Sequence, residues 1–176
     1  MQELSKEINM STIVQHQDLQ AFIASVYEKL GVPSEDAQTA AVIAVASDLR
    51  GVESHGVVML PRKVDYMLQG LIESKPNIKI ERESPATALM DGGNGLGAVV
   101  ATQAMELCIQ KAKNVGAGFV SVHDSNHYGI AGYYTMMALE HDMIGISMTN
   151  TTPILAPTFS SKATIGTNPL SVAAPA

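Results

Sequence analysis

The stretch GFVSVHDSNHYGIAGYY, residues 118–134, decides the fold, because a strand pattern passes into a helix start within it. Its apolar first half predicts a buried strand, and the segment from Ser125 onward predicts the opening of a helix. Asn126 and His127 stand at this junction beside Gly129, where the lack of a side chain lets a ligand approach the backbone. Ligands of layered α/β proteins gather at such junctions. The stretch therefore predicts a candidate site near His127.

Outward from this stretch, the sequence after residue 77 alternates between strand and helix patterns. Such alternation is typical of a layered α/β unit. The chain from Thr151 onward is rich in Pro, Ser and Thr, which predicts strand edges and loops. The predicted strands are 78–84, 86–92, 118–125 and 143–150, and a helix is predicted at 98–116.

Residues 1–77 predict helices instead. The predicted helices are 16–30, 34–50 and 54–69. Ser54 is expected at the N-cap of the third helix, and Pro61 is expected to kink or restart it. The expected fold class is α/β, with a helical segment over 1–77 followed by a layered α/β domain over 78–176.

Composition excludes several classes of function. The chain has 176 residues and a net charge of −6, so it is not drawn to nucleic acid or to an anionic membrane surface. The N-terminus lacks an apolar signal segment, and no apolar run reaches the ~20 residues of a membrane span. The single cysteine, Cys108, has apolar neighbours that predict an inert buried thiol. We therefore expect a cytoplasmic protein without a nucleic-acid or membrane partner.

Ser54-His55-Gly56 is the first candidate for chemistry. One interpretation is purely structural: an N-cap, a chance histidine and a glycine at a helix start. The other is chemical, because a histidine in the first turn of a helix meets the positive end of the dipole, which disfavours its cationic form. Such a His55 would exchange a proton near neutral pH. Spacing alone leaves both interpretations open.

His127 is the second candidate, and its structural alternative is a histidine satisfied by Asn126 or by a backbone group. His123 and Asp124 precede it, but strand alternation sends these two side chains to opposite faces, so we expect no metal site. The segment GGNGLG, residues 92–97, matches neither a dinucleotide fingerprint nor a Walker loop. A flexible turn before a helix is preferred to a phosphate cradle there, and a Rossmann fold gets no support.

Four motifs together resemble the malate/L-lactate dehydrogenase family of the second type, a group of non-Rossmann NAD(P)-dependent oxidoreductases. They follow one another through almost the whole chain, as DLRGVESHG (48–56), SNHYGIAGYY (125–134), GISMTNTTPILAP (145–157) and GTNPLSVAAP (166–175). The resemblance implies a homodimer with a nicotinamide-binding domain of unusual fold. It also implies NAD or NADP as the cofactor and a small 2-hydroxy acid, such as malate or lactate, as the substrate.

The resemblance further implies a role for individual residues. His55 would donate and accept the proton, oriented by Ser54, and Thr167 would approach the substrate. The histidine at the position of His127 is assigned to catalysis in some family members and to cofactor contact in others. The residues implied to line the cofactor are His127, Tyr128, Gly129, Ile130, Ala131, Asn150 and Thr151.

Two residues depart from the family's pattern. The family usually carries an arginine four residues after the S-H-G histidine and often a tyrosine eight after it, whereas this chain has Met59 and Lys63. These positions lie one helical turn apart on the same face. We hypothesise that Lys63 moves the positive charge that meets the substrate carboxylate along by one turn. The alternative is that Lys63 is a solvated surface residue.

Length is the larger departure, because the family continues beyond G-T-N-P-L with a second segment that completes the active site. We therefore expect a domain that is incomplete at its C-terminus and a C-terminal companion segment. Two alternatives to a malate- or lactate-type dehydrogenase remain. One is a reductase of the same family that acts on a cyclic imine or a sugar-derived keto acid, and the other is a truncated interaction subunit without catalytic activity.

Overall fold

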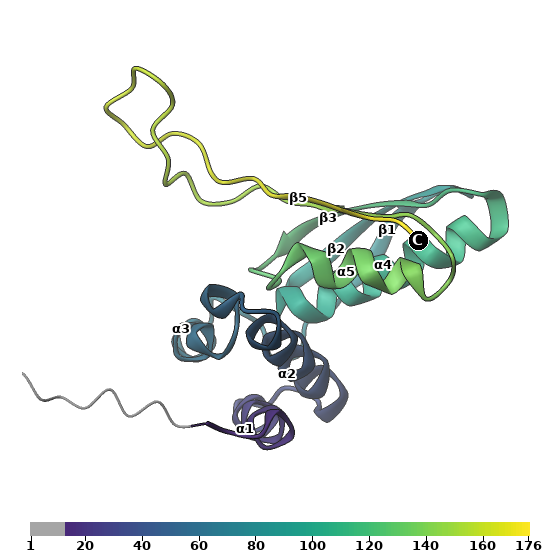
Figure 1. Ribbon diagram of the computed structural model, residues 1–176. Helices are drawn as coiled ribbons and strands as arrows, with labels where there is room; N and C mark the ends of the chain where they lie inside the picture. The colour runs from purple at the N-terminus through teal and green to yellow at the C-terminus, as the bar shows by residue number, and fades with distance from the viewer. Residues whose placement is uncertain (1–12) are drawn as a thin grey trace, which may run out of the picture.

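The computed structural model describes residues 13–176, in which a helical part precedes a mixed part of helices and strands (Figure 1). The predicted α/β class with helices at the N-terminus is confirmed. Residues 1–10, in which the sequence shows no apolar signal segment, lie outside the described residues. The helices are α1 (His16–Lys29), α2 (Ser34–Leu49), η1 (Glu53–His55), η2 (Val57–Met59), α3 (Leu60–Leu68), α4 (Gly97–Val115) and α5 (Ala131–Leu139). The strands are β1 (Lys79–Glu83), β2 (Thr87–Gly95), β3 (Phe119–Ser125), β4 (Gly145–Met148) and β5 (Leu170–Ala173).

Helices α1 and α2 pack together through small side chains. Ala37, Ala40 and Ala41 of α2 are fully buried, which explains why this helix is rich in alanine. Ile23 and Tyr27 of α1 belong to the same core, where large side chains fill the space that the alanines leave. No helix within residues 13–176 combines the length and the apolar character that crossing a membrane requires.

Strands β1, β2 and β3 form one sheet in that order. β1 and β2 are antiparallel neighbours, whereas β2 and β3 run parallel and are connected through helix α4. Met90 of β2 packs against Val100 and Ala104 of α4 in a small core of its own. The prediction that β3 is buried is wrong, because the described residues leave Phe119 65% exposed.

The second sheet consists of β4 and β5, which pair antiparallel against helix α5. A Cβ on Gly145 would overlap with the backbone of Thr135, so the strand and the helix meet at a distance that only glycine permits. Thr135 Oγ1 also lies 3.2 Å from Ser171 Oγ of β5. The strand predicted at 143–150 is present as β4, and β5 lies in the part of the chain that was predicted to form strand edges and loops.

Residues 149–169 form an arm that projects away from the helices and the first sheet (Figure 1). The arm is held by its own backbone, because Leu155 and Ile165 bridge its two sides with N–H···O distances of 2.9 and 3.2 Å. Phe159 lies fully exposed at its far end. The predicted loops and strand edges are therefore present, but they leave the body of the molecule rather than cover it.

Two sequence predictions are wrong in detail. The third helix does not begin at Ser54: two 3₁₀ turns, η1 and η2, come first, and α3 begins at Leu60 with Pro61 in its first turn. The restart expected at Pro61 is therefore confirmed. The segment 92–97 is not a flexible turn, because β2 continues through Gly95 and α4 begins at Gly97.

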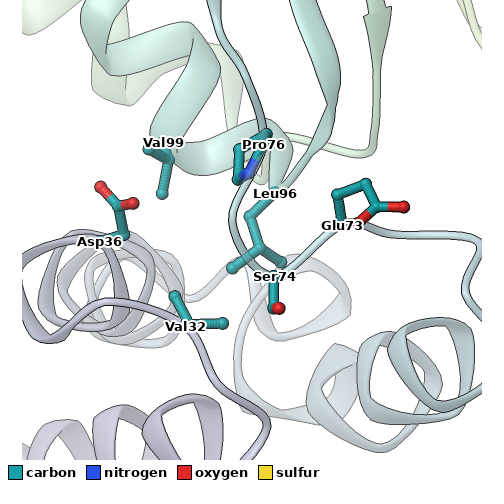
Figure 2. Close-up of a pocket in the computed structure, with 7 residues that line it drawn as sticks. All are labelled: Val32, Asp36, Glu73, Ser74, Pro76, Leu96 and Val99. Atoms are coloured by element: carbon teal, nitrogen blue, oxygen red, sulfur yellow. The ribbon is translucent and has the colours of Figure 1, made fainter.

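A narrow cleft, too tight to hold a water molecule, lies where the helical part meets α4 (Figure 2). Val32, Leu96 and Val99 contribute apolar side chains to this cleft, and Asp36 stands at its edge. Burial, with a smaller effect from the neighbouring Glu35, raises the pKa of the Asp36 carboxyl. The cleft is lined by none of the candidate site residues, so we regard it as a packing joint.

The closest backbone approach that bears on the site lies between α4 and the loop after β3. A Cβ on Gly97 would overlap with the carbonyl group of Asn126. The Asn126 side-chain amide donates at 3.0 to 3.1 Å to Asn94 O, Asn94 Oδ1 and Gly95 O. These contacts fix the loop that carries His127 against the end of β2 and the start of α4.

We predict that Gly97→Ala destabilises the protein by ~1–3 kcal/mol, because the added methyl group forces apart two backbone segments that have no room to move. Chemical denaturation of the full-length protein would measure this change. Gly132→Ala is the matched control, since a Cβ there meets only Ser171 Oγ at 3.8 Å and alanine favours the helix. Equal stability of the two variants would contradict the prediction.

Candidate functional site

The structure brings together two histidines that lie far apart in the sequence. The ring centroids of His55 and His127 are 5.2 Å apart, and the rings are tilted by 35°. His55 belongs to turn η1, which follows α2, and His127 belongs to the loop between β3 and α5. Both rings therefore stand at the junction between the helical part and the first sheet.

Turn η1 is held by the last turn of helix α2. The Asp48 carboxylate accepts the N–H of Val57 at 2.9 Å, on the far side of the S-H-G motif. A Cβ on Gly56 would overlap with this carboxylate, so only glycine fits between the helix and the turn. The glycine of the motif is explained by this packing rather than by a helix start.

Ser54 orients the ring of His55 and caps no helix. Its Oγ lies 2.9 Å from His55 Nδ1, and no side-chain cap bond is present at η1 or α3. This bond leaves Nε2 of the half-buried His55 ring free to meet another group. The expected N-cap is therefore wrong, because the hydroxyl is used by the neighbouring imidazole.

His127 takes its hydrogen bond from the backbone. The N–H of Gly129 donates to His127 Nδ1 at 3.4 Å, and Gly129 adopts a φ of +86°, which favours glycine. Asn126 does not satisfy His127, because its amide is used by residues 94 and 95. Of the two structural alternatives, only the bond to a backbone group is present.

Lys63 is buried rather than solvated. It is 7% exposed, and its amine makes no hydrogen bond or ion pair with any residue between 13 and 176. Burial lowers the pKa of the amine to about 8. The alternative of a solvated surface lysine is therefore wrong. Its neighbour Arg62 points elsewhere, with Nε donating to Tyr66 Oη at 2.9 Å and the guanidinium over the Tyr66 ring.

The charges near His127 are all basic. Crowding by protein atoms, followed by the effects of Lys63, His55 and Arg62, lowers the pKa of His127 to about 4. The ring nevertheless keeps an exposed face. A neutral imidazole, a second imidazole and a buried amine form a site suited to an anionic molecule, because no carboxylate of the described residues pairs with any of them.

Stacked tyrosines support the loop beyond His127. Tyr128 stacks on the fully buried Tyr134 with centroids 5.0 Å apart, and Tyr133 meets Tyr134 edge-on at 5.7 Å. The Tyr134 hydroxyl donates to the carbonyl of Tyr128, and Tyr128 Oη lies 3.4 Å from Ser147 Oγ of β4. The tyrosine pair noted in the sequence therefore braces the loop between α5 and β4.

Asn150, Thr151 and Thr167 form a separate group at the base of the arm. Thr151 Oγ1 accepts the N–H of Thr167 at 2.8 Å, and the Thr151 N–H donates to Asn168 Oδ1 at 3.0 Å. No hydrogen bond or ring contact within residues 13–176 links this group to His55 or His127. Its expected contacts with cofactor and substrate stay predictions.

His123 and Asp124 lie together, contrary to expectation. Asp124 has a φ of +47°, which breaks the strand alternation and brings its carboxylate to 3.0 Å from His123 Nδ1. The other ring nitrogen lies 3.1 Å from Glu81 Oε2 of β1. Asp91 adds a further ligand-type oxygen nearby but pairs with Lys79 at 3.1 Å. Ion pairs across the sheet account for this cluster, and the absence of a metal site stays a prediction.

Sequence reasoning found Asn126 as the neighbour of His127 but missed the contacts that fix the loops of the site, because no local pattern encodes them. Asp48 accepts the Val57 N–H, the Asn126 amide donates to residues 94 and 95, and the Tyr134 hydroxyl donates to the Tyr128 carbonyl. Only the small residues next to them, such as Gly56 and Gly97, signal in the sequence that another group comes close.

Comparison with known proteins gives a consistent result. Residues 14–176 match the family model described as malate/L-lactate dehydrogenase. The chain is 53% identical over 158 residues to a malate dehydrogenase of Pyrococcus abyssi, covering 90% of this chain and 44% of that protein. It is 48% identical over 161 residues to an L-sulfolactate dehydrogenase of Methanocaldococcus jannaschii, covering 92% and 47%.

A solved structure agrees with these sequence matches. The malate dehydrogenase of Pyrococcus horikoshii superposes with a TM-score of 0.91 at 52% identity, over 93% of this chain and 47% of that one. The chain therefore spans about half the length of the curated relatives it matches.

We predict that the charge on His123 makes the sheet's stability depend on pH. Glu81 first, then Asp124, raise the pKa of His123 above 6.5. A raised pKa in the folded state means that the stabilisation is complete below pH 6.5 and is lost as the pH rises through the folded-state value. Urea unfolding of the full-length protein between pH 5 and 9 would show this loss.

His123→Gln should flatten that part of the profile. His141→Gln is the matched control, since the exposed His141 side chain forms no ion pair with residues 13–176. A His123→Gln profile that follows the parent would show that the ion pairs contribute nothing.

Proposed function

The chain belongs to the malate/L-lactate dehydrogenase family, and we propose that the protein transfers a hydride between NAD or NADP and a small 2-hydroxy acid such as malate or lactate. The pairing of His55 with His127, beside the buried amine of Lys63, carries this proposal. Because the chain spans about half of its relatives, the activity is proposed for the protein together with the C-terminal companion segment.

His55 is the proposed proton donor and acceptor. Oxidation of a 2-hydroxy acid removes the hydroxyl proton while the hydride leaves the same carbon, and reduction returns both. Ser54 fixes His55 Nδ1, so the free Nε2 would face the hydroxyl. The bound nicotinamide would supply the hydride acceptor. The substrate would thus lose one proton to His55 and one hydride to the cofactor.

The start of helix α5 supports a cofactor position beside His127. Its N-cap residue, Ile130, makes no side-chain cap bond, and its carbonyl accepts the Tyr133 N–H at 3.2 Å, so the amides of Ala131 and Gly132 are those that would meet a phosphate group. Gly129 and Ala131 bring no bulk to this surface. We propose that the cofactor lies along His127, Tyr128, Gly129, Ile130 and Ala131, with Asn150 and Thr151 as further contacts.

Lys63 is proposed to meet the substrate carboxylate, with Thr167 as a second contact. The Lys63 side chain is 7% exposed, but its amine is not sealed from solvent and has no hydrogen bond or ion pair with residues 13–176, so a carboxylate could reach it and supply a counter-charge. Met59, which stands where the family usually has arginine, cannot play this part. This difference also supports the second candidate, a reductase of a cyclic imine or a sugar-derived keto acid, whose carboxylate the same amine would meet.

Assembly, localisation and the domain boundary belong to the same proposal. We propose a cytoplasmic homodimer that binds small-molecule acids and neither nucleic acid nor membrane. The third alternative, a truncated interaction subunit, requires that the complete assembly lacks activity. The boundary between a helical segment ending at residue 77 and a domain beginning at 78 is likewise proposed.

The proposed function is tested by following nicotinamide absorbance in the full-length protein. Malate, lactate, sulfolactate, a panel of 2-keto acids and a cyclic imino acid would be offered with NAD(H) and NADP(H). We predict turnover of a 2-hydroxy acid and a loss of ~10²–10⁴-fold in kcat for His55→Ala, because general acid–base catalysis contributes that much. His141→Ala is the control, and turnover by His55→Ala at the parental rate would overturn the assignment.

The role of Lys63 has its own test. We predict that Lys63→Met raises the KM for the preferred acid by ~10-fold or more, because a hydrogen bond between charged groups is lost. Lys113→Met removes an exposed lysine of α4 and serves as the control. An unchanged KM in Lys63→Met would show that the amine does not meet the substrate.

A further inference from the structure

Two imidazoles 5.2 Å apart raise the question of which one carries the proton. Two positive charges at this separation repel each other, so both rings are not protonated together. The two rings differ in the partner of Nδ1: a backbone N–H at His127 and a side-chain hydroxyl at His55.

The backbone determines the tautomer of His127. Because the Gly129 N–H donates to Nδ1, that nitrogen must offer a lone pair, and the ring proton resides on Nε2. Protonating His127 would place an Nδ1–H group against the Gly129 N–H, two donors facing each other. The Gly129 N–H cannot easily turn away, because it belongs to the same peptide group as the Tyr128 carbonyl, which accepts a hydrogen bond from the hydroxyl of the buried Tyr134.

The charged groups around His127 act in the same direction. The charges of Lys63 and Arg62 act on it from α3, and that of His55 acts from η1. All three are basic, and each disfavours a positive charge on the ring. His55 differs, because the partner of its Nδ1 is the Ser54 hydroxyl, which donates or accepts. His55 therefore keeps its hydrogen bond in either protonation state, whereas His127 loses its bond on protonation.

We propose that His127 is a permanently neutral donor through Nε2–H, that Lys63 and the Gly129 amide are the positioning groups that keep it so, and that His55 alone carries the proton. The catalytic part of this proposal rests on the proposed function. In the oxidation, the hydroxyl proton would move to His55 Nε2 and the Nε2 proton of His127 would stay in place, while a bound nicotinamide would supply the hydride acceptor. His127 donates to a substrate oxygen, so the site takes ligands that present an acceptor there.

The proposal predicts a ring that fails to titrate in the normal range. In the full-length protein with neither cofactor nor substrate, ¹⁵N-histidine NMR should show His127 as the Nε2–H tautomer, with a midpoint far below 6.5. Lys63→Met should raise this midpoint by about one pH unit, because a nearby positive charge is removed. Lys113→Met should leave it unchanged. A His127 midpoint near 6.5, an Nδ1–H tautomer, or no shift in Lys63→Met would overturn the proposal.

Conservative variants separate a donor from a proton carrier. Glutamine offers an N–H but takes up no proton, so His127→Gln should retain activity within ~10–100-fold and keep the parental pH profile, whereas His55→Gln should lose ~10³-fold or more. A pH profile that loses an ionisation in His127→Gln would overturn the proposal. The NMR result needs no turnover, so it holds or fails independently of the dehydrogenase activity.

Discussion

The contact between Gly97 and the backbone of Asn126 is the constraint on which the site depends. It joins the start of α4, just after β2, to the loop after β3, so it lies at the edge of the sheet where the carboxyl ends of these two parallel strands meet. The Asn126 amide then ties the loop to β2, so the next residue, His127, has little freedom of position. Because Gly97 has no side chain, the loop after β3 can lie against the start of α4, and this packing fixes the position of the His127 imidazole.

Electrostatics gives this location its chemical character. Charged side chains are rarely buried without a partner, yet Lys63 is 7% exposed and has no hydrogen bond or ion pair with residues 13–176, and its charge acts on His127. Arg62 acts on His127 more weakly than Lys63 and His55 do, and its guanidinium lies over the Tyr66 ring. The result is a small basic region in a protein whose net charge is −6.

Local patterns in the sequence were sufficient to predict most helices and strands and their order. Features that depend on distant partners were not predictable in this way. The 3₁₀ turns around His55 exist because Asp48 captures the amide of Val57, and no propensity reveals that contact. Asp124 is not a glycine but still adopts a positive φ, so the prediction from strand alternation that His123 and Asp124 point to opposite faces was wrong. The burial of Lys63 was similarly hidden, since a lysine in an amphipathic helix is normally read as a surface residue.

The two histidines, by contrast, were predictable as candidates because glycines mark the loops that carry them. Gly56 follows His55 directly and Gly129 follows His127 by two residues, and each marks a place where the backbone is confined. Their proximity to each other was beyond local reasoning, since it depends on how α2 and the first sheet pack.

The arm of residues 149–169 is attached to the rest of the described molecule at one end only, where β4 and β5 pair. Its tip at Phe159 has no support from the body, and its orientation is set where β4 and β5 pair at its root (Figure 1). A slight rotation of those two strands would swing Phe159 through a wide arc while Thr151 and Thr167, near the pivot, would barely shift. A partner that binds the tip would therefore change the orientation of the β4–β5 sheet without contacting either histidine.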